Sequence, residues 1–95
     1  MHIITRTRIL EAIEAHPDCE TNLNGWYRVM KRTRFRNFAE LKSSFGTVDK
    51  VGHVYVFNVA GNKLRLVAAI HFNRGKVFIR SILTHAKYDE DKWKE

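Results

Sequence analysis

The amino-acid sequence predicts an α+β fold in which an N-terminal helical hairpin packs on one face of a small, mainly antiparallel sheet, followed by a short C-terminal helix. Apolar residues recur at helical spacing up to Arg32 and at every second position from His53 onward. The pairs Gly61-Asn62 and Arg74-Gly75 separate the alternating segments as tight turns. The chain has 95 residues without a linker or an internal repeat, so residues 1–95 are expected to form a single domain.

Two helices are expected in the first third of the chain. A short strand is expected over residues 2–5, and Thr5 can cap a helix that begins at Arg6 and ends near His16, where Pro17 interrupts it. Asp18 can cap a second helix that ends at Arg32. A further helical turn is expected over residues 38–41, followed by a loop. The inner faces of the two long helices should carry Ile9, Leu10, Ala12 and Ile13, and Leu23, Trp26, Tyr27 and Met30.

The second half of the chain predicts three strands, over residues 53–59, 63–72 and 76–83, and Thr84 is well placed to cap the final helix. Two-residue turns are assumed in order to set the register between the strands. Asn58 and Thr84 then lie opposite Arg65. In the last hairpin, the residues Phe78, Arg80 and Ile82 are expected opposite His71, Ala69 and Val67.

One face of the predicted sheet is apolar from Leu64 to Phe72 and should meet the helices. We call the other face the open face. Arg65 and Arg80 lie on it, and no carboxylate occurs on the three strands to pair with them. Such guanidinium groups suit phosphate, but both side chains could equally extend into solvent. The residues expected on the open face are Val54, Val56, Asn58, Arg65, Val67, Ala69, Phe78, Arg80 and Ile82.

The composition narrows the possible functions. A net charge of +7 suits a polyanionic partner such as RNA, DNA, the ribosome or an acidic protein, without choosing among them. Cys19 is the only cysteine, so an intrachain disulfide is impossible and a thiolate zinc cluster implausible. The sequence has neither an apolar run long enough to span a membrane nor a signal-peptide core after Met1, so a cytoplasmic protein is expected.

Two segments carry a resemblance to a known family. They are residues 56–67, VFNVAGNKLRLV, and residues 77–89, VFIRSILTHAKYD. Together they resemble the pattern of HigB-type toxins within the RelE-like superfamily, and the pair Trp26-Tyr27 and residues 39–42 also fit. The resemblance covers nearly the whole chain in the right order.

The resemblance implies the toxin of a type II toxin–antitoxin system, an endoribonuclease that cleaves mRNA, typically during translation on the ribosome. It also implies a cognate antitoxin, usually a helix-turn-helix protein (HigA-like), with operator DNA bound only through the toxin–antitoxin complex. No cofactor is expected. The acidic residues are scattered over helices and loops and no two histidines have ligand spacing, so no metal site is expected either.

RNA can be cut by its own 2′-hydroxyl if a proton is moved at each reacting oxygen and cations stabilise the phosphorane. His85 is the first candidate for acid or base, because a histidine side chain is available in both protonation states near neutral pH. Tyr88 lies one helical turn later and could contact the phosphate or stack on a base. Each of these two could instead have only a structural role. The remaining candidates are Arg65 and Arg80 as the catalytic cations, Lys63, Asn58 and Lys87 as RNA-binding residues, and Arg32 and Arg34, in a basic cluster suited to RNA or an acidic antitoxin.

Two other functions remain open at this point. A non-catalytic RNA-binding module would explain the charge and the aromatic and arginine residues of the open face. A DNA-binding or regulatory protein is less consistent with the sequence, because the two N-terminal helices include no clear recognition helix.

Overall fold

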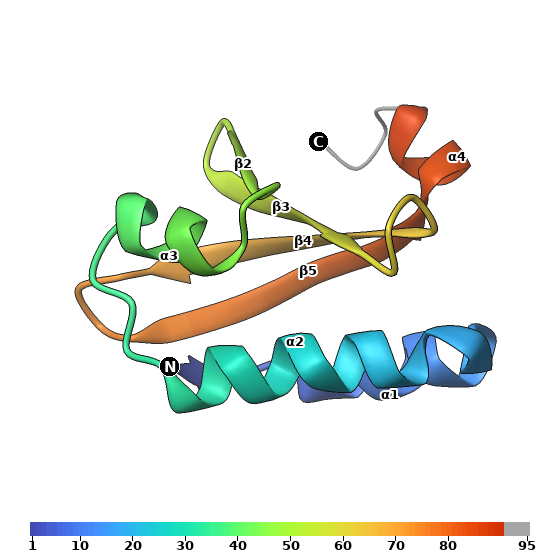
Figure 1. Ribbon diagram of the computed structural model, residues 1–95, viewed down its shortest axis with the longest axis horizontal. Coiled ribbons are helices and arrows are strands. Elements are labelled where there is room, and N and C mark those ends of the chain that lie inside the picture. Colours follow the sequence, from blue (N-terminus) through green and yellow to red (C-terminus); the bar gives the residue numbers. More distant parts are fainter. Residues whose placement is uncertain (91–95) are drawn as a thin grey trace.

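The computed structural model describes residues 1–90 and has an α+β architecture, which confirms the class expected from the sequence. Figure 1 shows α1 and α2 running side by side along one side of the sheet, with α4 at the far end on the other side. The helices are α1 (Arg6–Ala15), the 3-10 turn η1 (Pro17–Cys19), α2 (Glu20–Arg32), α3 (Phe38–Ser44) and α4 (His85–Asp89), and the strands are β1 (His2–Ile3), β2 (Asp49–Val51), β3 (Val54–Val59), β4 (Leu64–His71) and β5 (Lys76–Thr84).

The sheet is mixed and has five strands in the order β1-β5-β4-β3-β2. β1 pairs parallel to β5, whereas β2–β3, β3–β4 and β4–β5 are antiparallel pairs. The sequence analysis predicts no element for the segment that forms β2, because a strand of three residues is too short to show an alternating pattern.

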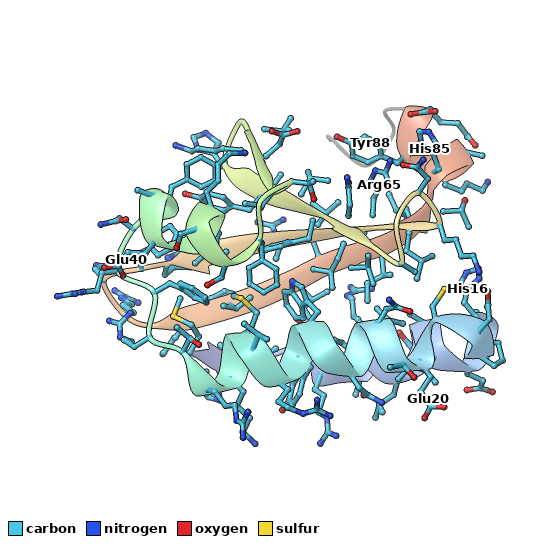
Figure 2. All side chains as sticks on the ribbon, in the orientation of Figure 1. His16, Glu20, Glu40, Arg65, His85 and Tyr88 are labelled. Carbon is cyan, nitrogen blue, oxygen red and sulfur yellow. The ribbon has the colours of Figure 1, made fainter. Side chains whose placement is uncertain are left out.

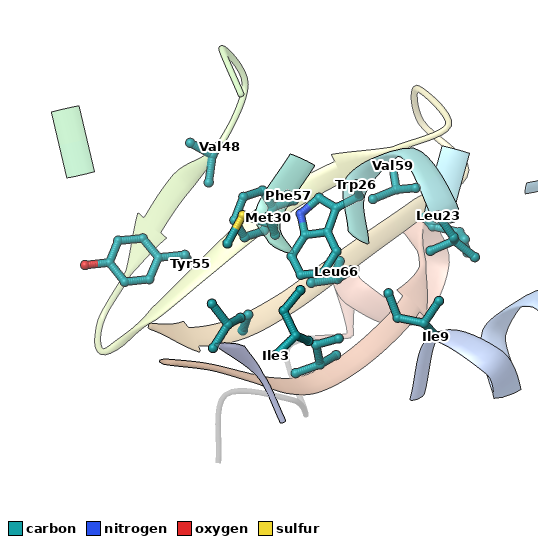
Figure 3. Close-up of a cluster of buried hydrophobic side chains, with 14 of the residues drawn as sticks. Ile3, Ile9, Leu23, Trp26, Met30, Val48, Tyr55, Phe57, Val59 and Leu66 are labelled. Carbon is teal, nitrogen blue, oxygen red and sulfur yellow. The ribbon is translucent and has the colours of Figure 1, made fainter. Parts of the chain in front are cut away.

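The hydrophobic core lies between the sheet and the helices (Figure 3). Phe57 of β3 is 1% exposed, and its ring meets Trp26 of α2 and Phe45 edge-on, with ring centroids 5.3 and 5.1 Å apart. Leu10 was predicted to lie on the inner face of α1, but this prediction is wrong, since 52% of the residue is exposed. The predicted inner-face residues that are buried are Ile9, Ala12, Leu23, Trp26 and Met30.

The predicted register is correct in one hairpin and wrong in the other. Asn58 pairs with Arg65 in the β3–β4 hairpin, as expected. In the β4–β5 hairpin, however, Phe78 pairs with Ala69, because His71 pairs with Lys76 and the turn is centred on Asn73 and Arg74, one residue earlier than predicted. The pairing of Thr84 with Arg65 is also wrong, because Leu83 lies opposite Arg65.

A β-bulge causes a second departure in β5. The register shifts between Val67 and Ala68, so that Ser81 pairs with Val67 and Ile79 with Ala68, leaving Arg80 as the extra residue. Ile79 and Ile82 both pack on the core, and two residues stand between them where strict alternation allows one. Ile82 therefore lies on the helix side, and its predicted place on the open face is wrong.

Of the three predicted N-caps, one forms and two do not. Thr84 caps α4 as expected, since its Oγ1 accepts a hydrogen bond from the backbone N–H of Lys87 at 3.2 Å. Thr5 and Asp18 form no side-chain cap. The Thr5 hydroxyl donates instead to the carbonyl oxygen of Ile79 at 3.0 Å, which ties the start of α1 to β5. Asp18 lies in η1 and binds Lys63.

Arg34 holds the β4–β5 hairpin against the segment that follows α2. Its Nη1 donates to the carbonyl oxygens of Phe72 at 2.6 Å and Phe35 at 3.1 Å, and its Nη2 to that of Asn73 at 3.4 Å. Gly75 has a φ of +66°, and a Cβ there would lie 3.0 Å from the guanidinium of Arg34. The glycine thus permits both the turn and the close approach of the arginine.

Replacing Arg34 with alanine should lower the free energy of unfolding by about 1–2 kcal/mol, because three carbonyl groups lose a charged donor. Urea denaturation followed by circular dichroism measures this change. Arg32→Ala is the matched control, because Arg32 is exposed and makes no hydrogen bond within residues 1–90, and it should change stability by less than about 0.5 kcal/mol. Equal effects of the two substitutions would contradict a structural role for Arg34.

Within residues 1–90, no helix is long and apolar enough to cross a membrane.

Candidate active site

Arg65 is the buried charged residue of the open face. It is 8% exposed, and strand alternation directs its side chain away from the core that holds its neighbours Leu64 and Leu66. Val67, on the same face, is also buried and lies outside the hydrophobic core cluster. Arg65 therefore carries its charge in surroundings with little water, where electrostatic interactions are strong.

The guanidinium of Arg65 has only weak partners. Its Nη1 donates to the carbonyl oxygens of Leu64 at 3.2 Å and Gly61 at 3.4 Å, and its Nη2 reaches Oδ1 of Asn62 at 3.5 Å. No carboxylate of residues 1–90 forms an ion pair with it. A buried cation without a counter-ion is a suitable group for binding an incoming phosphate.

Helix α4 places two more candidates beside Arg65 (Figure 2). The backbone N–H of His85 donates to the carbonyl oxygen of Lys63 at 3.3 Å, which fixes the start of α4 at the β3–β4 turn. Tyr88, one turn later, lies with its ring centroid 5.9 Å from the guanidinium carbon of Arg65, within range of a cation–π interaction. The His85 Nδ1 lies 3.5 Å from Oδ2 of Asp89, and the imidazole is half exposed.

Arg80 approaches the same face through the β-bulge. Because Ile79 and Ile82 both point into the core, the two residues between them are left to the other side of the sheet. Arg80 is exposed, and no partner is found for it within the described part of the chain. Leu83 pairs with Arg65, so Arg80 lies three residues along β5 from that position, or roughly 10 Å. The two arginines are thus suited to neighbouring phosphates.

The predicted RNA-binding residues around Arg65 differ in whether their side chains already form ion pairs. Asn58 is exposed on β3, directly opposite Arg65. Lys63 forms an ion pair with Asp18, with Nζ and Oδ2 2.8 Å apart, and Lys87 lies 3.7 Å from a carboxylate oxygen of Glu90. Both lysines remain largely solvent-exposed, so an RNA phosphate could compete for them.

Arg32 and Arg34 do not belong to this site. Arg32 is the last residue of α2 and Arg34 follows the helix, whose residues Leu23 and Met30 pack on the core side of the sheet. Arg32 is exposed at the end of the helix, and the guanidinium of Arg34 donates hydrogen bonds to the β4–β5 hairpin. The structure therefore brings together Arg65, Tyr88, His85, Asn58, Lys63, Lys87 and, more loosely, Arg80.

No group of three or more histidine, cysteine, aspartate or glutamate side chains gathers anywhere in residues 1–90 in an arrangement that could hold a metal ion.

The ion pair between Asp18 and Lys63 gives a test in solution. The hydrogen bond from Lys63, followed by its positive charge, lowers the pKa of the Asp18 carboxyl below its usual 3.8, and the same hydrogen bond raises the pKa of Lys63 above 10.5. The contribution of Asp18 to stability is therefore present above pH 3.8 and lost as the pH falls through its lowered folded-state pKa. The contribution of Lys63 is present below pH 10.5 and lost as the pH rises through its raised pKa.

We expect an NMR titration of the Asp18 side-chain carboxyl carbon to give a pKa below 3.8, and the substitution Lys63→Met to raise this pKa. Lys50→Met, in an exposed strand, is the control and should leave Asp18 unchanged. An Asp18 pKa of 3.8 or higher in the unmodified chain would mean that the pair does not form in solution.

Asn62 and Ser81 join the site without having been predicted as site residues. Asn62 was interpreted as a turn residue, yet its side-chain oxygen faces Arg65. Ser81 faces the open side only because of the bulge. The one sequence signal was the pair of consecutive polar residues, Arg80 and Ser81, which interrupts the alternation of β5.

The site thus combines a buried arginine with no carboxylate partner among residues 1–90, an aromatic ring over it and a histidine at the edge. With the net charge of +7, this arrangement defines a small basic α+β protein whose open sheet face can bind the phosphate backbone of a nucleic acid.

Comparison with known proteins identifies the family to which the chain belongs. Residues 19–91 match the family model HigB_toxin, described as the RelE-like toxic component of a toxin–antitoxin system. The chain is 36% identical over 92 residues to the mRNA interferase toxin HigB of Escherichia coli strain K12, covering 94% of this chain and 88% of that protein. It is 34% identical over 93 residues to the mRNA interferase HigB of Escherichia coli O6:H1, covering 95% and 90%. The chain belongs to the HigB toxin family.

Proposed function

We propose that this chain is the toxin of a toxin–antitoxin pair and an endoribonuclease that cleaves mRNA. Its relatives are named mRNA interferases and span most of its length, which supports both the class and the reaction. The single structural observation that carries the proposal is the buried guanidinium of Arg65, which has no carboxylate partner in residues 1–90 and lies beneath Tyr88 and beside α4. In this arrangement the N-terminal helices form a hairpin that backs the sheet and leaves its open face to the RNA.

The proposed reaction needs no metal ion. The 2′-oxygen of the RNA attacks the adjacent phosphorus, the bond from phosphorus to the 5′-oxygen breaks, and a 2′,3′-cyclic phosphate and a 5′-hydroxyl result. One proton leaves the 2′-oxygen and one is delivered to the 5′-oxygen. His85 moves one of these protons, and Arg65 stabilises the negative charge that develops on the phosphorane oxygens.

The remaining residues position the RNA in this proposal. Arg80 binds the neighbouring phosphate, and Asn58, Lys63 and Lys87 contact the strand on either side. The phenol of Tyr88 contacts the phosphate or stacks on the exposed base. We place the reaction on mRNA that is being translated, in the cytoplasm, where the ribosome presents a single strand to the open face. The antitoxin is a helix-turn-helix protein, and operator DNA is bound by the complex of the two.

Primer extension on a reporter mRNA in a bacterial cell-free translation reaction tests the proposal. The unmodified chain should produce discrete new 5′ ends that disappear when an inhibitor stops elongation. His85→Ala and Arg80→Ala should each lower their yield by about tenfold or more. Arg74→Ala is the control, since Arg74 is an exposed arginine in the β4–β5 loop.

A second function, an RNA-binding module without catalysis, is favoured by the aromatic and arginine groups on a sheet face, which suffice for binding. It predicts that the folded chain protects mRNA without cutting it and that His85→Ala changes nothing. That result would withdraw the enzymatic proposal.

A further inference from the structure

A cavity of about 310 Å³ lies between α2 and the end of β3. One wall is a single face of α2, whose lining residues stand at helical spacing, and the other wall is formed by β3 and Phe45. We call it the edge cavity. Trp26 and Val59, which lie on opposite walls, are both labelled in Figure 3. The residues that line the edge cavity are Asn22, Gly25, Trp26 and Val29, Phe45, and residues 58–60.

The edge cavity borders a part of β3 that has only one neighbouring strand. β2 pairs with residues 54–56 alone, so within residues 1–90 no strand lies beside the rest of β3 on that side. The backbone groups of an antiparallel strand face its two neighbours at alternate residues, and those of Val54 face β2 across a two-residue turn. The N–H and C=O groups of Asn58 therefore point to the side on which β2 has ended.

Asn58 also connects the edge cavity to the proposed active site. It lines the cavity and pairs with Arg65 across the β3–β4 ladder, where the Cβ atoms of paired residues are about 5 Å apart. Successive residues of a strand point to opposite faces, so a cavity lined by both Asn58 and Val59 lies at the edge of the sheet and is open to both faces. A nucleotide whose phosphate contacts Arg65 can thus extend its base into the edge cavity.

The lining suits the uncharged, aromatic part of a nucleotide. None of the residues of the described chain that line the edge cavity is charged, whereas Arg65 lies on the neighbouring open face. The rings of Trp26 and Phe45 are surfaces on which a base can pack, and the two asparagine amides can each donate and accept hydrogen bonds at its edge. The positive charge is therefore placed for the phosphate, and the neutral groups are placed for the base.

Trp26 contributes a hydrogen-bond donor that is not yet used. The residue is 4% exposed, and its Nε1 is a buried polar atom for which residues 1–90 provide no hydrogen-bond partner. A buried indole N–H usually has a partner, and an unpaired one is destabilising. Bases carry carbonyl oxygens or ring nitrogens that can accept this hydrogen bond. Because Nε1 is covered in the free protein, the indole has to shift when a base binds.

We propose, on the basis of the function proposed above, that the edge cavity binds the base next to the cleaved phosphate and so sets the base preference of the cleavage. Arg65 contacts the phosphate. Asn58 contacts the edge of the base through its side-chain amide and its free backbone groups, and the indole N–H of Trp26 donates to an acceptor atom of the base.

Gly25 allows the edge cavity to be filled without changing a proposed catalytic group. A Cβ at Gly25 would have no atom within 4 Å other than those of its chain neighbours and its own helix backbone, so a leucine side chain has room to enter the cavity. Gly25 lies in the interior of α2, where leucine favours the helix more than glycine does. Thr21→Leu, at an exposed position of α2 outside the cavity, is the matched control.

Primer extension on a pool of reporter mRNAs in the cell-free translation reaction tests the proposal. The bases on each side of every new 5′ end are counted for the unmodified chain and for both variants. We expect the unmodified chain and Thr21→Leu to share a base preference at one position beside the cut. Gly25→Leu should weaken that preference by about fivefold or more, and urea denaturation would establish that it is folded.

An NMR titration of the full chain detects the base itself. The probe is a 2′-O-methyl dinucleotide, which lacks the attacking hydroxyl, and Trp26→Phe identifies the Trp26 signal among the two indole N–H signals of the chain. We expect the dinucleotide to shift the Trp26 indole signal of the unmodified chain and of Thr21→Leu. The signal should stay in place in Gly25→Leu, and also when the dinucleotide lacks the base next to its phosphate.

Two results would overturn the inference and leave the proposed function intact. Folded Gly25→Leu could cut mRNA with the base preference of the unmodified chain, or the dinucleotide could shift the Arg65 signals without shifting the indole signal of Trp26. If instead the unmodified chain produced no new 5′ ends at all, the proposed function would fail, and the base site would fail with it.

Discussion

Replacing Arg65 with alanine should reduce the rate of mRNA cleavage about 10²–10³-fold, the loss expected when a pre-positioned group that stabilises developing negative charge is removed. The reason is structural. Arg65 is nearly buried, it has no carboxylate partner in residues 1–90, and its donors are held only weakly by carbonyl oxygens. In the alanine variant, water would stabilise the developing negative charge much less well than the guanidinium does. The yield of new 5′ ends per unit time in the translation reaction measures the effect.

Arg65→Lys separates charge from geometry. Lysine keeps the positive charge but lacks the planar guanidinium that contacts two oxygens at once. Arg65→Lys should therefore cleave mRNA about tenfold more slowly than the unmodified chain. Urea denaturation must show that both variants are folded, because Arg65 also packs beneath Tyr88. A folded Arg65→Ala chain that cleaves mRNA at the unmodified rate would remove Arg65 from the proposed mechanism.

Phe57→Ala should lower the free energy of unfolding by about 3–5 kcal/mol, the usual range for removing a buried aromatic ring. Phe57 joins the sheet to α2 through Trp26 and to the segment after α3 through Phe45. A domain of this size has only about 5–14 kcal/mol of total stability, so a large fraction of the variant could be unfolded at 37 °C. Urea denaturation followed by circular dichroism gives the difference directly.

Two further substitutions define the scale of that measurement. Phe57→Leu keeps most of the buried volume and should cost less than half as much as the alanine substitution. Leu10→Ala, on an exposed position of α1, should change stability by less than about 0.5 kcal/mol. If Phe57→Ala were no more destabilising than Leu10→Ala, the ring contacts of Phe57 with Trp26 and Phe45 would not support the core as described.

The fold class and one hairpin could be predicted because their signals are local. The Gly61-Asn62 turn and the alternation on both sides of it place Asn58 opposite Arg65, and the structure confirms that pairing. The β4–β5 register depends instead on where within the loop the chain reverses direction, and Arg34, nearly forty positions earlier in the chain, contacts that loop. A contact so distant along the chain leaves no periodic signal.

The candidate site shows the same division. Strand alternation placed Arg65 on the open face, and helical spacing placed His85 and Tyr88 on one face of α4. Sequence spacing could not show that Lys63 would be engaged by Asp18 or that Arg34 would serve the hairpin, because both depend on residues far away along the chain. Charged residues of the same type thus have different roles that only the folded structure distinguishes.

The bulge at Arg80 has a consequence for how variation in β5 should be interpreted. Before the bulge, the interior positions are odd-numbered, at Val77 and Ile79, and after it the interior position is even-numbered, at Ile82. Inserting or deleting one residue within this strand would exchange buried and exposed positions from there to the start of α4. We therefore expect the length of β5 to be more strictly conserved among relatives than the identity of any single exposed residue in it.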